Sequence, residues 1–179
     1  MNHYTAIVNG RIYTGRDILK GKAILVEGDK VLDVVDENMV PESARRLDAK
    51  GYAIAPGFID LQIYGGGDYL FAAHPTTEAL AHISKALVQT GTTGFMLTLA
   101  TNTPAVFDRA IEAAKHYSHP AFLGLHFEGP YLNPAKRGAH PAELIRRPER
   151  AEIAALLERA AGHVKIMTVA PELFDSDSL

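Results

Sequence analysis

The sequence predicts an α/β fold in which parallel strands alternate with helices, after a small antiparallel β layer. Short apolar runs separated by turn dipeptides occupy residues 1–54, a pattern typical of paired strands. From residue 55 to residue 179, strand-like and helix-like periods alternate instead. We therefore expect two domains, one covering residues 1–54 and one covering residues 55–179.

The N-terminal layer is predicted to contain two hairpins. Residues 6–8 and 11–13 flank Asn9-Gly10, a dipeptide that tolerates the positive φ of a tight turn. Residues 23–26 and 31–35 form a second apolar pair around a glycine-containing turn. We expect these strands to build an antiparallel sheet that forms part of a β-sandwich-like domain.

The second region is predicted to alternate strands with helices. Apolar residues at helical spacing place helices at residues 76–90, from Pro104 onward and at residues 148–161. Thr103 is placed to cap the second helix, with Pro104 at its first position. Strands are predicted at residues 58–63, 94–99, 121–126 and 164–169. Because helices separate them, these strands should run parallel.

Two architectures fit this alternation: an open doubly wound sheet, or the first half of a (β/α)8 barrel. A complete barrel usually takes about 250 residues, and the alternating region from residue 55 to residue 179 is about half of that. The sequence also stops at residues 172–179, where a further helix would begin. A truncated barrel explains that ending better than an open sheet does, although the strand pattern alone fits both.

Composition argues against several classes of partner. The 18 basic and 21 acidic side chains give a net charge of −3, too balanced to indicate nucleic-acid or membrane-surface binding. No apolar run is long enough to span a bilayer, and no basic segment followed by an apolar one marks a secretory signal. With no cysteine in the sequence, metal ligands would be His, Asp or Glu. We expect a cytoplasmic protein.

Three polar clusters occur at the carboxyl ends of predicted strands, where barrel enzymes place their active groups. In the first, Asp60, Gln62 and Tyr64 alternate along a strand and so share one face. These polar groups need partners or a ligand, because leaving them unpaired costs about 1–3 kcal/mol each. The alternative interpretation is a hydrogen-bond network under the glycine-rich turn at residues 65–67.

The second cluster is His126 and Glu128, which share a face at the end of an apolar strand. A carboxylate in that position must be paired, protonated or bound to a metal, since an unpaired buried charge is too costly. Imidazole and carboxylate both bind Zn²⁺, but a catalytic zinc needs three protein ligands. A metal site and a buried structural pair between His126 and Glu128 therefore both stay open.

The third cluster is the loop at residues 133–141, which contains Lys136, Arg137, Gly138 and His140. Such a loop could hold an anionic or hydroxyl-rich ligand, with His140 as a proton donor or a group that polarises a carbonyl. The alternative is an ordinary solvated loop.

Together the three clusters resemble one family. Residues 56–60 (Pro-Gly-Phe-Ile-Asp) are similar to the first barrel strand of the amidohydrolase superfamily. Residues 124–133, with Lys-Arg-Gly-Ala-His at 136–140, resemble the signature of N-acetylglucosamine-6-phosphate deacetylases, and residues 168–172 resemble that family's fourth strand end. The resemblance implies a partial (β/α)8 TIM-type barrel and metal-dependent deacetylation of N-acetylglucosamine 6-phosphate to glucosamine 6-phosphate and acetate.

The resemblance also implies roles for individual residues. Glu128 is expected to be a metal ligand, and Ala139 and His140 to contact the sugar, with His140 polarising the acetamide carbonyl. Many amidohydrolases bind a second metal through a His-x-His pair on the first strand, where this sequence has Gln62 and Tyr64. A single divalent ion is therefore implied, Zn²⁺ or otherwise Fe²⁺, Mn²⁺ or Co²⁺, with Gln62 hydrogen-bonding the metal-bound water.

The family takes two further metal-binding histidines and a catalytic aspartate from later strands that this sequence does not contain. We therefore expect a fragment that is inactive alone, and a full-length homodimer that acts on a small amino-sugar phosphate. The alternatives are another amidohydrolase, such as a dihydroorotase or an adenine deaminase, and a non-catalytic fragment that associates through exposed strand edges.

Overall fold

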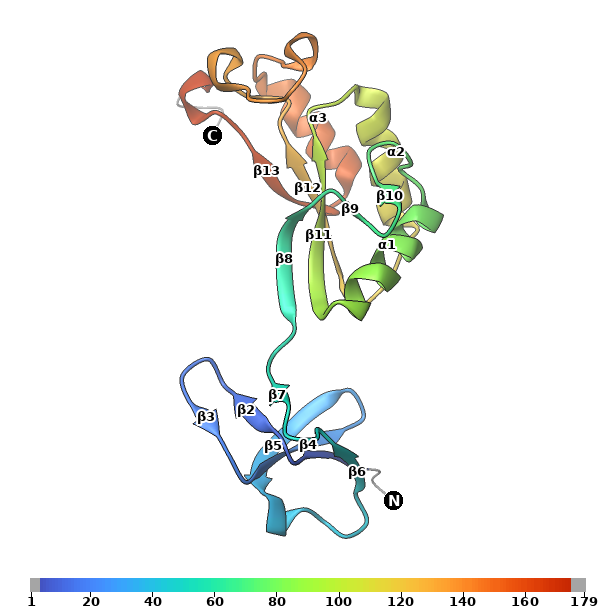
Figure 1. The fold of residues 1–179 in the computed structure, drawn as a ribbon. Coiled ribbons are helices and arrows are strands. Elements are labelled where there is room, and N and C mark those ends of the chain that lie inside the picture. The colour runs from blue at the N-terminus through green and yellow to red at the C-terminus, as the bar shows by residue number, and fades with distance from the viewer. Residues whose placement is uncertain (1–3, 175–179) are drawn as a thin grey trace. The chain divides into compact units, whose positions relative to one another are not determined.

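The computed structural model describes residues 4–174, which belong to two compact units divided between Pro56 and Gly57 (Figure 1). The sequence placed this boundary after residue 54. Residues 175–179, which carried part of the argument for a truncated barrel, lie outside the described residues. Within the described residues, no helix is long and apolar enough to cross a membrane.

The first unit contains two sheets. A four-stranded sheet has the order β5-β4-β1-β6, and a three-stranded sheet has the order β3-β2-β7. The strands are β1 (Tyr4–Val8), β2 (Arg11–Tyr13), β3 (Ile18–Leu19), β4 (Lys22–Glu27), β5 (Lys30–Asp36), β6 (Arg45–Asp48) and β7 (Ala53–Ile54), with a 3₁₀ turn at Glu37–Met39. Small apolar side chains on β1 and β4, among them Ala6 and Ala23, are fully buried and form the centre of this unit's core.

Two expectations for this unit are wrong. The layer is not purely antiparallel, because β6 joins β1 in parallel and β7 joins β2 in parallel. Asn9 does adopt a positive φ of 55°, but Asn9-Gly10 connects strands of two different sheets instead of closing a hairpin. The predicted hairpin between β4 and β5 is confirmed, since these two strands pair antiparallel. Local turn residues set the bend, whereas the partner of each strand is set by tertiary packing.

The second unit alternates strands and helices as the sequence predicts. Its four parallel strands have the order β13-β12-β11-β8, and a short hairpin, β9-β10, follows β8. The elements are β8 (Phe58–Ile63), β9 (Gly65–Gly66), β10 (Tyr69–Leu70), α1 (Thr77–Gln89), β11 (Thr92–Ala100), α2 (Pro104–Lys115), β12 (Phe122–Glu128), α3 (Arg150–Ala160) and β13 (Val164–Thr168), with 3₁₀ turns at Pro134–Lys136, Ala142–Leu144 and Pro171–Leu173.

The helices begin where the sequence provides start signals. At the start of α1, the Thr76 hydroxyl accepts a hydrogen bond from the backbone N–H of Ala79, which satisfies one otherwise unpaired donor. Pro104 occupies the first turn of α2, as expected. Thr103 holds the N-cap position of α2, but its side chain makes no capping hydrogen bond, so its predicted capping role is wrong.

The two faces of the parallel sheet differ in chemistry. Residues such as Leu97 on β11 and Phe127 on β12 are fully buried against all three helices, which lie on one side of the sheet (Figure 1). The opposite face carries polar side chains, including Gln62, His126 and Glu128. Strand order follows chain order without reversal and the described helices cover one face only. An open doubly wound sheet, with helices on both faces, does not fit this arrangement.

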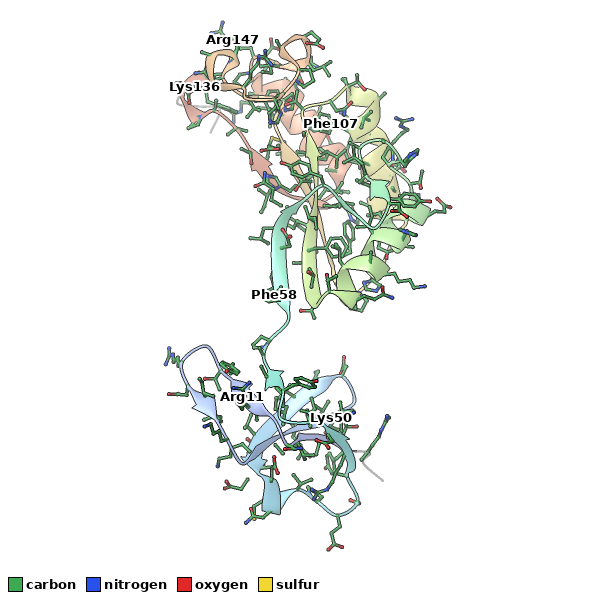
Figure 2. All side chains as sticks on the ribbon, viewed as in Figure 1. Arg11, Lys50, Phe58, Phe107, Lys136 and Arg147 are labelled. Carbon is green, nitrogen blue, oxygen red and sulfur yellow. The ribbon has the colours of Figure 1, made fainter. Side chains whose placement is uncertain are left out.

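We predict that Phe127→Ala destabilises the second unit strongly. Phe127 is fully buried and its ring centroid lies 4.5 Å from that of Phe107, a residue labelled on α2 in Figure 2. Truncating a buried Phe leaves a cavity and should lower the free energy of unfolding by about 3–5 kcal/mol. Chemical denaturation measures this value. Phe58→Ala, on a side chain that is 72% exposed, is the control, and an equal loss in both variants would contradict the assignment of the core.

Candidate functional site

The Glu128 carboxylate is the centre of the polar face. Glu128 is the last residue of β12, and its side chain is 20% exposed. The Gln62 side-chain amide donates to Oε1 over 3.1 Å, and the Tyr64 hydroxyl donates to Oε2 over 2.6 Å. Gln62 Nε2 also donates to the Tyr64 hydroxyl over 2.9 Å. Both carboxylate oxygens are therefore held by neutral donors.

These donors come from a strand that is not the neighbour of β12. Gln62 is the second-last residue of β8, Tyr64 directly follows that strand, and β11 lies between β8 and β12. Neighbouring strands are about 4.8 Å apart, so two strand spacings in a flat sheet separate the backbones by about 9–10 Å. Side chains from both strands meet because the sheet is concave on this face. Curvature therefore makes the carboxyl ends of β8 and β12 converge.

His140 reaches the same carboxylate from the loop after β12. Its Nε2 lies 3.7 Å from Glu128 Oε2, and its side chain is 14% exposed. The backbone N–H of Thr101, just after β11, donates to His140 Nδ1 over 3.3 Å, and the Thr101 hydroxyl lies 2.9 Å from the same nitrogen. A backbone N–H can only donate, so Nδ1 carries the lone pair and the neutral ring has its proton on Nε2. The Nε2–H therefore faces Glu128.

Gly129 permits this close approach between the ends of β11 and β12. It adopts a positive φ of 89°, and a Cβ atom built on it would lie 2.2 Å from Thr101 Oγ1. Any other residue at position 129 would displace Thr101, the residue that holds His140. The glycine after the acidic strand end is therefore a structural requirement of the site.

The environment of Tyr64 changes its acidity. Burial raises the pKa of Tyr64 above its ordinary value, and the hydrogen bond and charge of Glu128 raise it further, while the hydrogen bond from Gln62 lowers it. The raised pKa keeps the phenol protonated and able to donate. The pKa of Tyr64 is raised in the folded state, so the environment of the protonated phenol contributes to stability below the ordinary pKa of about 10. That contribution is lost as the pH rises through the raised pKa of Tyr64 in the folded protein.

The structure places the other candidate residues less directly. Asp60 accepts a hydrogen bond from the backbone N–H of Gln62 and does not contact Glu128 in the described residues. Ala139 is exposed in the loop that carries His140. His126 lies on the polar face but forms its hydrogen bonds with Leu61, Thr98 and Thr168, so the suggested buried pair with Glu128 is not what the structure contains.

Thr101 was missed by the sequence analysis. Its one available signal is its position, a small polar residue directly after an apolar strand at the same sheet edge as Glu128. The loop itself is basic on its outer side: Lys136 and Arg147, labelled in Figure 2, lie in the segment between β12 and α3. The Arg137 guanidinium donates to the backbone carbonyl of His140, so that cation supports the loop.

The described residues supply part of a binding site for a divalent metal. Among residues 4–174, no group of three His, Asp or Glu side chains is placed to hold an ion. Glu128 nevertheless has the character of a single ligand, because it is a mostly buried carboxylate whose hydrogen-bond donors are uncharged. Its negative charge thus remains without a fixed cation among the contacts described above. The donor set supplies one ligand of the three that a catalytic zinc requires.

Comparisons with known proteins match both regions of the sequence. Residues 4–54 match the family described as the NagA composite domain, and residues 53–174 match the amidohydrolase family. The second match alone covers more than half of the chain.

Individual relatives carry deacetylase names. The human N-acetylglucosamine-6-phosphate deacetylase is 36% identical over 177 residues, which cover 92% of this chain and 42% of the human protein. An N-acetylgalactosamine-6-phosphate deacetylase of a Shewanella species is 38% identical over 122 residues, covering 66% of this chain and 31% of that protein. The crystal structure of the Pasteurella multocida N-acetylglucosamine-6-phosphate deacetylase matches 94% of this chain and 45% of its own, with 34% identity and a TM-score of 0.87. The chain thus spans less than half the length of each of these relatives.

We predict that Glu128→Gln lowers the pKa of Tyr64 towards its ordinary value. The substitution removes the negative charge that opposes ionisation of the phenol, while burial remains. The pKa is measured by NMR titration of ¹³C-labelled tyrosine, with Tyr64→Phe assigning the signal. Glu112→Gln is the matched control, since Glu112 pairs with Lys115 on α2. An unchanged or higher pKa of Tyr64 in Glu128→Gln would show that the phenol does not donate to this carboxylate.

Proposed function

The chain belongs to the amidohydrolase family, and from this premise we propose that the whole protein hydrolyses the acetamide of N-acetylglucosamine 6-phosphate. The products are glucosamine 6-phosphate and acetate. The whole protein here means this chain together with the part that its relatives carry and this chain does not span. The observation that carries the proposal is the meeting of Glu128 and His140, 3.7 Å apart, at one end of the parallel sheet in a chain whose relatives are deacetylases.

We assign the architecture accordingly. We propose that residues 55–179, which the structure describes up to residue 174, belong to the first half of a (β/α)8 barrel, and that residues 1–54, described from residue 4, belong to a β-sandwich-like domain. Sequential parallel strands, helices on one face and a concave polar face support the barrel. In this arrangement the edges of β8 and β13 pair with strands from the rest of the whole protein. The 179-residue chain by itself is then inactive.

Glu128 is proposed as one ligand of a single divalent ion, with Zn²⁺ as the first candidate. When bound, such an ion lowers the pKa of its water and polarises a carbonyl oxygen. The remaining ligands and the catalytic aspartate belong to the part that this chain does not span. Gln62 Nε2 lies 3.1 Å from Glu128 Oε1 and also donates to Tyr64, and we propose that the Gln62 side-chain oxygen accepts a hydrogen bond from a water beside that carboxylate.

His140 is proposed to bind and polarise the acetamide carbonyl. Thr101 holds its Nδ1 by a backbone N–H, and this leaves the Nε2–H as the donor that faces the site. A fixed N–H donor stabilises the negative charge that develops on a carbonyl oxygen when the amide is attacked. Ala139, which is exposed and precedes His140 in the loop, is proposed to contact the sugar as well.

Two further proposals concern the setting of the enzyme. We propose a homodimeric whole protein, as the family resemblance implies, and a cytoplasmic location, because a phosphorylated amino sugar is a charged metabolite that does not cross membranes unaided. The near-neutral charge balance, 18 basic against 21 acidic residues, supports a small-molecule substrate over a polyanion.

A second candidate substrate is N-acetylgalactosamine 6-phosphate, which differs only in the configuration at C4. The Shewanella relative named for that substrate is 38% identical to this chain, slightly more than the human relative, over a shorter segment. Identity at this level does not separate the two sugars, so both belong in the test.

We expect the whole protein to release acetate from N-acetylglucosamine 6-phosphate when it is assayed against a substrate panel. The panel contains both acetylated sugar phosphates, unphosphorylated N-acetylglucosamine, dihydroorotate and adenine. Acetate release is measured by a coupled enzymatic assay. Conversion of dihydroorotate and of adenine is measured by the change in absorbance. The 179-residue chain alone serves as the negative arm. Turnover of dihydroorotate or adenine without acetate release would replace this proposal with another amidohydrolase activity, and turnover by the isolated chain would refute its inactivity.

We predict that Glu128→Gln in the whole protein lowers metal affinity and turnover by at least about 100-fold, because an amide replaces an anionic ligand of nearly the same shape. Metal content after dialysis is measured by mass spectrometry, together with acetate release. Glu112→Gln, the exposed glutamate of α2, is the control and should match the wild type. Unchanged metal content in Glu128→Gln would remove this residue from the metal site.

A further inference from the structure

One buried histidine on the polar face has no part in the proposed chemistry. His126 lies two residues before Glu128 on β12 and is 5% exposed. Its Nδ1 lies 3.0 Å from the backbone carbonyl oxygen of Leu61 and 3.3 Å from Thr98 Oγ1, and its Nε2 lies 2.7 Å from Thr168 Oγ1. One side chain on β12 therefore contacts β8, β11 and β13.

The contact with β8 occurs where the register of that strand shifts. Phe95 of β11 pairs with Asp60, and Leu97 pairs with Ile63. Between these pairs, Leu61 and Gln62 of β8 lie opposite the single residue Met96, which is the pattern of a β-bulge. A bulge disrupts the local ladder and changes the direction of the side chains that follow it, often beside an active site.

Side chains satisfy the polar groups of this bulge. A carbonyl oxygen can only accept, so His126 Nδ1 carries a proton and donates it to the Leu61 carbonyl. The backbone N–H of Gln62 donates to Asp60 Oδ1 over 3.0 Å. The neutral His126 ring then accepts at Nε2 from the Thr168 hydroxyl. His126 thus holds the carbonyl of Leu61, and Asp60 holds the N–H of Gln62, the two residues of the bulge.

We propose that His126 is a positioning residue that locks the bulge of β8 and so directs Gln62 and Tyr64 at the Glu128 carboxylate. Gln62 directly follows Leu61, the residue that His126 holds, and Tyr64 lies on the same face two residues later. Without the Nδ1–H donor, the Leu61 carbonyl loses a buried partner and this part of β8 can return to a regular register. A one-residue slip would turn Gln62 away from Glu128. The role of His126 in positioning groups around Glu128 rests on the proposed function. The lock, meaning the hydrogen bond by which His126 fixes the bulge of β8, does not rest on it.

The competing explanation is that His126 only fills space in the core of the polar face and links β12 to β13 through its hydrogen bond with Thr168. The two ring nitrogens allow these roles to be separated. In His126→Asn, the side-chain amide nitrogen can replace Nδ1 and keep the donor to Leu61. In His126→Gln, the longer amide replaces Nε2, keeps the contact with Thr168 and loses the donor to Leu61. A space-filling role predicts no preference for Asn over Gln.

The first measurement is hydrogen–deuterium exchange of residues 58–66 in the metal-free whole protein. His126→Gln should exchange about tenfold faster than the wild type in this segment, the size expected for the loss of one hydrogen bond to a partly buried carbonyl. His126→Asn should stay close to the wild type. Thr168→Val, which removes only the Nε2 partner, should leave this segment unchanged and remains informative if both His126 variants fail to fold. Faster exchange of residues 58–66 in Thr168→Val, or equal exchange in the Asn and Gln variants, would overturn the lock.

The second measurement tests positioning in the same variants. The dissociation constant for Zn²⁺, measured by chelator competition, should rise about 10–100-fold in His126→Gln and be largely restored in His126→Asn, as for other residues that orient a metal ligand. Acetate release should follow the same order. Unchanged Zn²⁺ affinity in a His126→Gln protein with faster exchange would overturn positioning. Because exchange and Zn²⁺ binding need no substrate, failure of the deacetylase assay is distinguishable from failure of this inference.

Discussion

Curvature of the parallel sheet is the constraint on which the site depends. His126 shows it most directly, because a short imidazole on β12 reaches a backbone carbonyl of β8 across the intervening strand β11. The two backbones would be about 9–10 Å apart in a flat sheet, beyond the reach of such a side chain directed away from the sheet plane. On a concave face, inward side chains converge instead. The same convergence brings Tyr64 within 2.6 Å of Glu128, and it is what a strand arc of a barrel requires.

The electrostatics of Glu128 follow from the kind of partner that curvature brings to it. An amide and a phenol each donate to one oxygen of the carboxylate, and an oxygen left without a donor there would cost about 1–3 kcal/mol, while a further lone pair on each oxygen stays available. Neither donor carries a positive charge, so the carboxylate keeps its net charge. A lysine or arginine in place of Tyr64 would satisfy the same oxygens and also compensate the charge. Neutral donors therefore stabilise the carboxylate while leaving it attractive to a cation.

Periodicity was sufficient to predict the second unit but not the pairing of the first. The helices at α1, α2 and α3 and the four parallel strands follow from apolar spacing, because each segment buries one face against the same core. The partners of β1 and β2 do not follow from Asn9-Gly10, since a turn dipeptide determines a local bend and not a sheet. For the site, strand alternation predicted that Gln62 and Tyr64 share a face. The bulge, the tautomer of His140 and the role of Thr101 depend on contacts between distant residues, which no local pattern encodes.

The residues on β8 also bear on how many ions the site accommodates. Two imidazoles at positions 62 and 64 would offer lone pairs to a metal, whereas Gln62 and Tyr64 direct N–H and O–H groups at Glu128. Burial and the neighbouring carboxylate raise the pKa of Tyr64, which favours the protonated phenol that donates to Glu128. On the curved face, Gln62 and Tyr64 of this region thus direct two donors at the carboxylate of β12 that we propose as a metal ligand. The direction of these hydrogen bonds supports the proposal of a single metal ion, because neither side chain offers it a second ligand.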